Sequence, residues 1–169
     1  SETKVMNHYP RFHNLRDIEI FELLAKDIES GRKIYTSIDA IKAQSERIEI
    51  ITKERINVEL QKILKSKTPS VGFLLLEKTD LLQRIMPELT DLKGVDVQEG
   101  QKHKDNFYHT LQVIDNVAEN SNNLWLRWAA LLHDIAKPAT KRFEEGTGWT
   151  FHGHEVVGGR MVPKIFTKL

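Results

Sequence analysis

Six polar side chains in the second half of the sequence have the chemistry of a metal site. Four are imidazoles, one is a carboxylate and one is an amine: His109, His133, His152, His154, Asp134 and Lys137. Imidazole nitrogen and carboxylate oxygen together suit a divalent cation that keeps open positions for water. The six occur within 46 residues, and this conjunction favours a metal site more than any one of them does.

The elements expected around these residues bring them together. Apolar residues at helical spacing predict a helix over residues 106–120, on which His109 shares an inward face with Val113 and Val117. The apolar run from residue 125 predicts a second helix, which ends in His133 and Asp134. Both side chains are costly to bury unless they are paired or metal-bound. They point about 100° apart on a helix, yet they can converge on a cation at the edge between their faces.

Other interpretations of the same residues stay open. A single histidine on an apolar face, such as His109, is more often a hydrogen-bonded core residue. An adjacent His–Asp pair can be an ion pair that the dipole at a helix C-terminus favours. Lys137 can be a solvated side chain at a frayed helix end before Pro138.

Composition and length narrow the class of protein. A chain of 169 residues can form one domain or two small ones. The absence of cysteine excludes disulfides, Fe–S clusters and thiolate zinc sites. The net charge of +1 does not by itself indicate nucleic acid. No segment reaches the roughly 18 apolar residues of a membrane span, and residues 1–12 lack a hydrophobic signal core. We therefore expect a cytoplasmic protein with no membrane partner.

Helical patterns predict an all-α fold in two parts. In the first part, Thr52 is a candidate N-cap for an amphipathic helix. Residues 87–105 contain two glycines and no periodicity, which predicts a long loop. We expect one domain over residues 1–89, a connecting loop over 90–105 and a second domain over 106–169. In the second domain, residues 144–148 indicate a short hairpin, and a last helix should begin near His154.

The first part also carries positive charge. Residues 32–67 contain nine basic and five acidic side chains, a net charge of +4. A surface that contacts a phosphate backbone needs such an excess. A solvated helix face can have the same composition, and on composition alone that second interpretation is favoured.

Several motifs resemble known families. YHTLQV at 108–113, ALLHDIAKP at 130–138 and FHGHEVVGG at 151–159 resemble the HD superfamily of metal-dependent phosphohydrolases. The segment from RIEI to PEL at 47–89 is similar to the RNA-binding neck of bacterial tRNA nucleotidyltransferases and poly(A) polymerases, those with a carboxy-terminal HD domain. The resemblance covers roughly residues 38–168 and leaves residues 1–35 unplaced.

The resemblance implies roles for single residues. His109, His133 and Asp134 match the metal ligands, while His154, and less directly His152, match positions that bind a second metal or the phosphate. Lys137 matches a lysine that neutralises phosphate charge, and with His154 it forms the implied catalytic pair. On the neck, RNA contacts are implied for the basic residues Lys53, Arg55, Lys62, Lys65 and Lys67. The implied cofactor is a divalent metal (Mg, Mn, Ni or Zn), and the implied partners are tRNA or other RNA 3′ ends and nucleotides.

The sequence departs from the family pattern at two points. The nucleotidyltransferase head of the family needs a Gly-Ser turn and an Asp-x-Asp pair, and neither occurs in this sequence. We therefore expect the RNA-binding and HD portion alone, without the transferase site. The HD pattern also ends in a further aspartate on a later helix, whereas no aspartate follows Asp134. We expect an HD domain that is incomplete at its C-terminus and a metal site that is mostly empty.

Three functional hypotheses follow from these observations. The first is the RNA-binding and HD portion of an enzyme that adds CCA or poly(A) to RNA 3′ ends. The second is a free-standing HD phosphohydrolase that acts on a nucleotide or a cyclic phosphate. The third is a structural module whose metal site has lapsed. The sequence does not choose between CCA addition and poly(A) addition.

Overall fold

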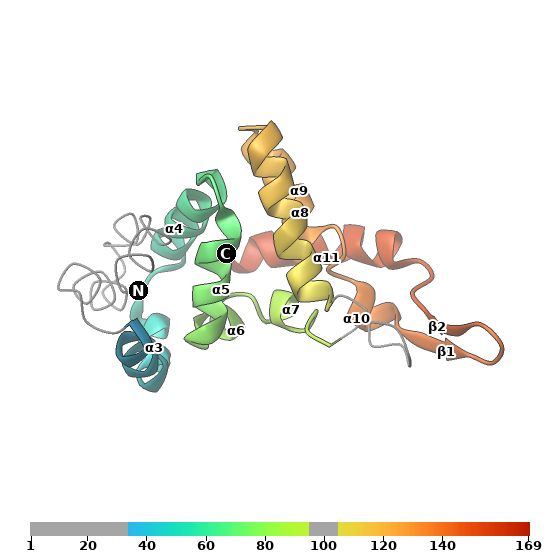
Figure 1. Cartoon of the computed structure of the whole chain (residues 1–169), viewed down its shortest axis with the longest axis horizontal. Coiled ribbons are helices and arrows are strands. Elements are labelled where there is room, and N and C mark those ends of the chain that lie inside the picture. The colour runs from blue at the N-terminus through green and yellow to red at the C-terminus, as the bar shows by residue number, and fades with distance from the viewer. Residues whose placement is uncertain (1–33, 95–104) are drawn as a thin grey trace.

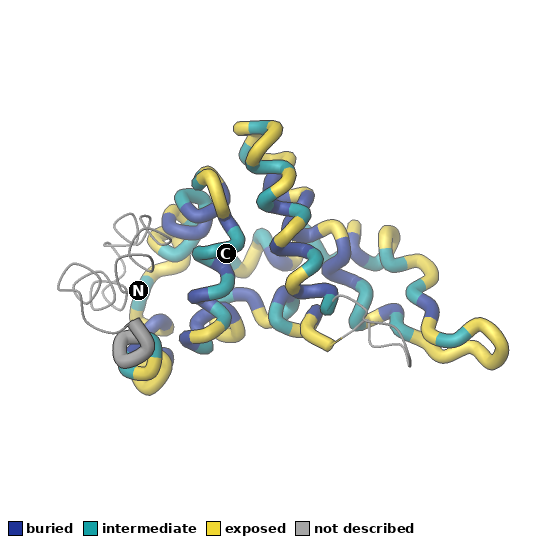
Figure 2. The backbone as a smooth tube through the Cα atoms, viewed as in Figure 1, coloured by how far each residue is buried: buried dark blue, intermediate teal, exposed yellow. Residues whose placement is uncertain are grey.

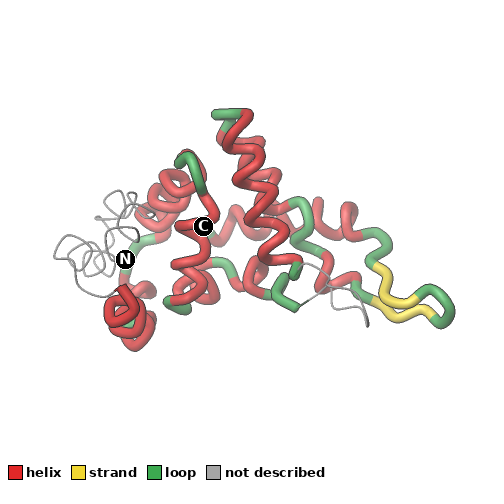
Figure 3. The backbone as a smooth tube through the Cα atoms, viewed as in Figure 1, coloured by secondary structure: helices red, strands yellow, loops and turns green. Residues whose placement is uncertain are grey.

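The structure, a computed structural model, describes residues 34–94 and 105–169 and is helical apart from one two-stranded hairpin (Figures 1 and 3). Its elements are α3 (Ile34–Ala43), the 3-10 helix η2 (Ser45–Ile50), α4 (Lys53–Lys65), α5 (Pro69–Lys78), α6 (Leu81–Ile85), α7 (Pro87–Thr90), α8 (Asn106–Asn120), α9 (Leu124–Leu132), α10 (Lys137–Thr140), β1 (Arg142–Glu144), β2 (Gly148–Thr150) and α11 (His154–Lys168). The predicted all-α class is confirmed.

Local sequence signals set the ends of the helices that matter most. The side chain of Thr52 accepts a hydrogen bond from the backbone N–H of Arg55, so the predicted N-cap of α4 is confirmed. Asp105 caps α8 in the same way through the N–H of Phe107. Asn123 caps α9 through two backbone N–H groups. These caps fix where α8 and α9 begin, and hence which of their residues reach the site.

The loop predicted over residues 87–105 begins with a short helix instead. Pro87 occupies the first turn of α7, where the missing N–H of proline costs nothing. Leu89 and Leu92 are fully buried there, so burial of apolar side chains orders a stretch that has no periodicity. Residues 95–104 of the predicted connecting loop lie outside the described residues.

The predicted hairpin and last helix are confirmed. β1 and β2 pair antiparallel around the turn at residues 145–147, with Phe143 opposite Trp149. The hairpin projects from the end of the molecule beside α10 (Figure 1). α11 then begins at His154 and runs back past α8 and α9 towards the N-terminal helices (Figure 1).

The two parts of the fold pack on one continuous core (Figure 2). α5 lies against α8 and α4 lies against α9, and both parts supply fully buried side chains such as Leu64, Phe73, Phe107 and Leu131. No helix within residues 34–94 and 105–169 has the length and apolar character to cross a bilayer.

Two polar contacts, one of them fully buried, join the parts. Arg127 of α9 is only 2% exposed, and its guanidinium donates to the carbonyls of Leu64 and Ser66 at 2.6 and 2.7 Å. The same group donates to the carbonyl of Ser121 at the end of α8. Asp115 of α8 accepts hydrogen bonds from the backbone N–H and the hydroxyl of Ser70, at the start of α5. Helix ends of one part are therefore capped by side chains of the other.

Candidate metal centre

Three predicted ligands converge in the structure. One ligand atom from each of His109, His133 and Asp134 lies within 4.8 Å of the other two. His109 comes from the first turns of α8, and the His133–Asp134 doublet follows the last residue of α9. The His109 and His133 rings meet edge to face, with centroids 5.9 Å apart. The crossing of α8 and α9 therefore brings together residues that are 24 positions apart in sequence.

Burial of the doublet differs from the sequence expectation. Asp134 is 7% exposed, whereas the side chain of His133 is 36% exposed. Helical spacing places His133 with Leu126 and Ala129, but this side of α9 is exposed, and Leu126 is 48% exposed. The carboxylate is therefore the buried member, and His133 closes the site towards solvent.

Backbone carbonyls fix the tautomers of two histidines. Nδ1 of His133 lies 2.7 Å from the carbonyl oxygen of Ala130, and Nδ1 of His154 lies 2.9 Å from that of Phe151. A carbonyl can only accept, so each Nδ1 must carry the proton. Each Nε2 is then free to bind a metal, and both face Asp134, at 3.1 Å for His133 and 3.8 Å for His154. Hydrogen bonds of this kind orient metal-binding histidines.

Asp134 is the electrostatic centre of the site. Burial acts to raise the pKa of its carboxyl group, but hydrogen bonds from His133 and Lys137 outweigh burial and lower that pKa to about 2. The hydrogen bond to Asp134 in turn raises the pKa of His133. Lys137 Nζ lies 3.1 Å from Asp134 Oδ2. The carboxylate is therefore ionised at neutral pH and available as a ligand.

Lys137 is held in the site from three sides. Besides Asp134, its ammonium contacts Asn106 Oδ1 at 3.4 Å and lies 5.7 Å from the centre of the Phe151 ring. Its side chain is 19% exposed, which differs from a solvated lysine at a frayed helix end. Sequence reasoning missed Asn106 and Phe151, because neither residue type signals such a contact.

His152 lies apart from these residues. Its side chain is 81% exposed, and its Nε2 is 3.8 Å from Glu144 of the hairpin. His154 is two residues further on, at the start of α11, and its side chain is 26% exposed. The structure thus brings His154 to Asp134 and leaves His152 at the surface.

The donor set fits a divalent cation. With Nδ1 protonated, the lone pair of His133 Nε2 faces a carboxylate oxygen at 3.1 Å, an arrangement that requires a proton or a cation between the two atoms. Two imidazoles and one carboxylate suit magnesium less well than manganese, nickel or zinc, because magnesium prefers oxygen ligands.

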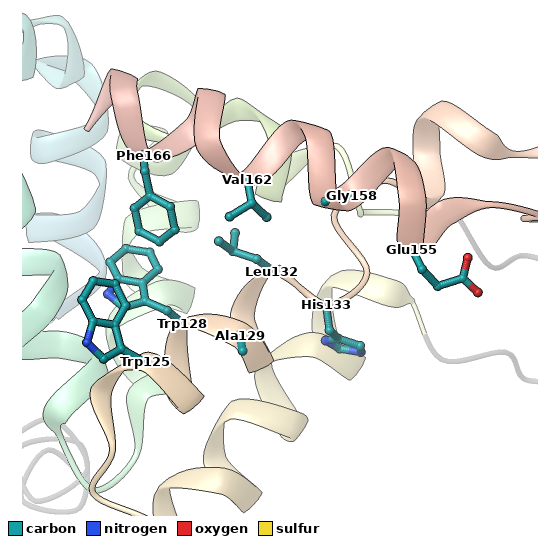
Figure 4. Close-up of a pocket in the computed structure, with 10 residues that line it drawn as sticks. Trp125, Trp128, Ala129, Leu132, His133, Glu155, Gly158, Val162 and Phe166 are labelled. Atoms are coloured by element: carbon teal, nitrogen blue, oxygen red, sulfur yellow. The ribbon is translucent and has the colours of Figure 1, made fainter.

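A groove of about 400 Å³ adjoins the site between α9 and α11 (Figure 4). His133 and Glu155 lie at one end, and Trp125, Trp128 and Phe166 gather at the other. The Phe166 ring contacts both tryptophan rings edge to face. The groove therefore adds an apolar surface beside the polar cluster.

The five basic residues predicted for RNA contact do not form one cluster. Lys53 and Arg55 lie in the first turn of α4, and Lys65 ends it. The 13 residues of α4, from Lys53 to Lys65, span about 18 Å of helix. Lys62 donates to Glu59 at 2.7 Å, and Lys67 lies exposed beyond the helix.

Comparison with protein families supports both parts of the chain. The family described as "Probable RNA and SrmB-binding site of polymerase A" matches residues 36–93. The HD domain family matches residues 106–169. No solved structure matches the chain.

Curated relatives carry related names. An A-adding tRNA nucleotidyltransferase of Deinococcus radiodurans is 38% identical over 119 residues, which are 69% of this chain and 27% of that protein. A CC-adding tRNA nucleotidyltransferase of Thermus thermophilus is 36% identical over 118 residues, 64% of this chain and 26% of that protein. A multifunctional CCA protein of Pseudomonas fluorescens is 30% identical over 172 aligned positions, which cover 97% of this chain and 41% of that protein.

The described residues thus comprise a helical HD domain packed against an RNA-binding domain of the polymerase A type. The chain belongs to the tRNA nucleotidyltransferase and poly(A) polymerase family, and it matches the carboxy-terminal part of the CCA-adding members. It spans between about a quarter and two fifths of the length of the relatives named above.

Proposed function

We propose that this chain is the RNA-binding and HD portion of an enzyme that adds nucleotides to tRNA 3′ ends. The polymerase A-type domain binds tRNA, and the HD domain holds a divalent cation through His109, His133 and Asp134. Lys137 and His154 contact a phosphate of the bound RNA or nucleotide. We assign no transferase step to these residues, because the Gly-Ser turn and the Asp-x-Asp pair are absent from the sequence.

One observation carries the proposal. Ligand atoms of His109, His133 and Asp134 lie within 4.8 Å of one another in the HD domain. The domain that precedes it in sequence belongs to a family named for RNA binding, and the two domains share one hydrophobic core. Relatives that align with 64–97% of this chain are named A-adding or CC-adding tRNA nucleotidyltransferase, or multifunctional CCA protein.

The arrangement supports a division of roles in the HD site. A divalent cation bound there would supply a Lewis acid and lower the pKa of its water. Asp134 contributes the negative charge, and the Ala130 and Phe151 carbonyls keep Nε2 of His133 and of His154 directed towards it. The Lys137 ammonium provides positive charge for phosphate oxygens, because Asn106 and Phe151 hold it beside the carboxylate.

Binding of tRNA tests the first half of the proposal. We expect a labelled tRNA to bind the chain in fluorescence anisotropy, with log K falling as log[salt] rises, by roughly 0.7–0.9 per phosphate contact. Lys53→Glu combined with Lys62→Glu should weaken binding. An affinity that is the same at low and high salt would contradict the neck assignment.

Metal stoichiometry tests the second half. Purified protein that has been treated with chelator and dialysed against manganese, nickel or zinc should bind up to one equivalent, and His109→Ala should bind less. His152→Ala serves as the matched control, because His152 lies outside the cluster. Equal uptake by both variants would overturn the ligand assignment.

A second candidate is phosphohydrolase activity of the HD domain by itself. The Lys137 and His154 side chains beside Asp134 favour this activity, because they could neutralise a phosphate group as it is attacked. Hydrolysis of a cyclic nucleotide in the presence of manganese, lost in Lys137→Ala, would support it.

A further inference from the structure

A second cavity, of about 230 Å³, lies at the RNA-binding domain, and none of its lining residues belongs to the metal centre. Its walls come from η2, α4 and α6 and from the last two residues of the chain, Lys168 and Leu169. Seven of its nine lining residues fall within the range that matches the RNA-binding family, residues 36–93. The end of α11 thus closes a cavity of the other domain.

Three cationic side chains stand at the rim of the cavity. Lys53, Arg84 and Lys168 line it, against one acidic lining residue, Glu49. Arg84 is held by Ser45 Oγ at 3.2 Å and by Glu49 at 2.9 Å, with Glu46 3.7 Å away. Lys168 donates to Glu88 at 2.7 Å. The lining side chains by themselves sum to +2, but Arg84 and Lys168 are ion-paired, and Glu46 and Glu88 from outside the lining offset that charge. Phosphate oxygens would therefore have to replace these carboxylates at Arg84 and Lys168.

The floor of the cavity is apolar. It is made of isoleucines and one leucine: Ile48, Ile51, Ile56, Ile85 and Leu169. A flat nucleobase can pack on such a surface while its phosphates stay at a cationic rim. A small anion would contact only the cations at the rim, and a purely apolar ligand would contact only the isoleucine floor.

We propose that this cavity binds one nucleotide unit of RNA, with the base on the isoleucine floor and the phosphates at Lys53, Arg84 and Lys168. The proposal rests on the RNA-binding function proposed above and names its site. It differs from the sequence expectation, which assigned RNA contact to basic residues along all of α4. Lys65 is the last residue of that helix and Lys67 lies beyond it, and neither residue lines the cavity.

The first experiment compares three pairs of lysine substitutions in the whole chain, with tRNA binding followed by fluorescence anisotropy. Lys53→Gln with Lys168→Gln should weaken binding at least about fivefold at low salt, and should reduce the salt slope by roughly 1.4–1.8, the value for two phosphate contacts. Lys65→Gln with Lys67→Gln tests the other end of α4. Lys78→Gln with Lys164→Gln removes the same charge at exposed positions outside the cavity. Circular dichroism melts verify that each variant is folded.

The outcomes separate this proposal from the proposed function. If wild-type protein binds tRNA and only the Lys65/Lys67 pair weakens binding, RNA binding stands and the cavity assignment is overturned. Equal loss in all three pairs also overturns it, because net charge alone then explains the effect. If wild-type protein does not bind tRNA, both the function and the cavity assignment fail.

A second experiment predicts a change of opposite sign. Glu49→Gln removes the acidic lining group and its ion pair with Arg84, while Ser45 and the more distant Glu46 still hold the guanidinium. We expect tRNA to bind about threefold more tightly. Unchanged or weaker binding would contradict a role for this rim.

A competition experiment tests the base contact. Single-stranded RNA should displace labelled tRNA better than inorganic polyphosphate does at equal phosphate concentration, because polyphosphate cannot use the isoleucine floor. Equal displacement by the two competitors overturns the nucleobase part of the proposal.

Discussion

Nε2 of His133 lies 3.1 Å from Oδ2 of Asp134, although Nδ1 of the same ring donates to the Ala130 carbonyl. Both nitrogens of the ring therefore face acceptors. Without a metal, the imidazole satisfies both only as the protonated imidazolium. A cation bound by Nε2 and Oδ2 would replace that proton, so metal and proton compete for one position.

The first prediction concerns His133. In chelator-treated protein, His133→Ala should lower the free energy of unfolding by about 1–2 kcal/mol, because the ring loses its partly exposed hydrogen bonds to the Ala130 carbonyl and to Asp134. Manganese or nickel at high concentration should raise the Tm of the parent protein, and this shift should be lost in the variant. His152→Ala should keep the shift. A shift of equal size in His133→Ala would contradict metal binding by this residue.

The second prediction concerns the pH dependence of the metal-free protein. The pKa of Asp134 is lowered to about 2 in the folded state from 3.8, so its contribution to stability is present above pH 4 and is lost as pH falls towards 2. The shift corresponds to about 2 kcal/mol. In urea titrations, lowering the pH from 4 to 2 should reduce the free energy of unfolding less in Asp134→Asn than in the parent protein. Parallel curves for the two proteins would count against the ion pair.

His133 acts in the other direction. Its pKa is raised above 6.5 by Asp134, so its contribution is complete below pH 6.5 and is lost as pH rises through the higher folded-state pKa. The pair should therefore stabilise the metal-free protein most between about pH 4 and 6.5.

The third prediction concerns Arg127. Arg127→Met removes the donors that satisfy the carbonyls of Leu64, Ser66 and Ser121, which lie at two helix ends. We expect a loss of about 3 kcal/mol or more, because buried acceptors lose charged donors. Arg160→Met, at an exposed position of α11, is the control and should change stability by less than about 0.5 kcal/mol. Similar urea midpoints for the two variants would contradict this role of Arg127.

The fourth prediction compares two glycines. A Cβ at Gly72 of α5 would lie 2.5 Å from Cγ2 of Ile63, so Gly72→Ala must push α4 and α5 apart. The expected cost is about 1–3 kcal/mol. A Cβ at Gly159 of α11 meets nothing within 4 Å, so Gly159→Ala should stabilise the protein by up to about 1 kcal/mol. Thermal melts of both variants check the pair, and a neutral Gly72→Ala would show that the helices can separate freely.

The sequence alone determined the fold class and most helix boundaries of the second domain. In the first domain, Thr52 was predicted as the N-cap of α4 because its side chain acts on a neighbouring backbone group. Asp105 and Asn123 cap α8 and α9 in the same local way, although the sequence analysis did not name them. The HD motifs also indicated that His109, His133 and Asp134 form one site. The order of these motifs along the chain identifies the family, whereas the spacing of the three residues alone does not. α7 escaped prediction, since only burial against the rest of the chain orders it.

Only the tertiary structure decided which charges meet. Leu126, Ala129 and His133 share an exposed side of α9, whereas Asp134 is buried, and the packing of α8 against α9 decides which of the two site residues faces solvent. The cations of the cavity, Lys53, Arg84 and Lys168, lie 31 and 84 residues apart along the chain. No local pattern relates such residues, because their proximity depends on how α11 returns to the first domain. The contacts of Arg127 with α4 have the same origin, since long-range packing alone brings α9 to the end of that helix.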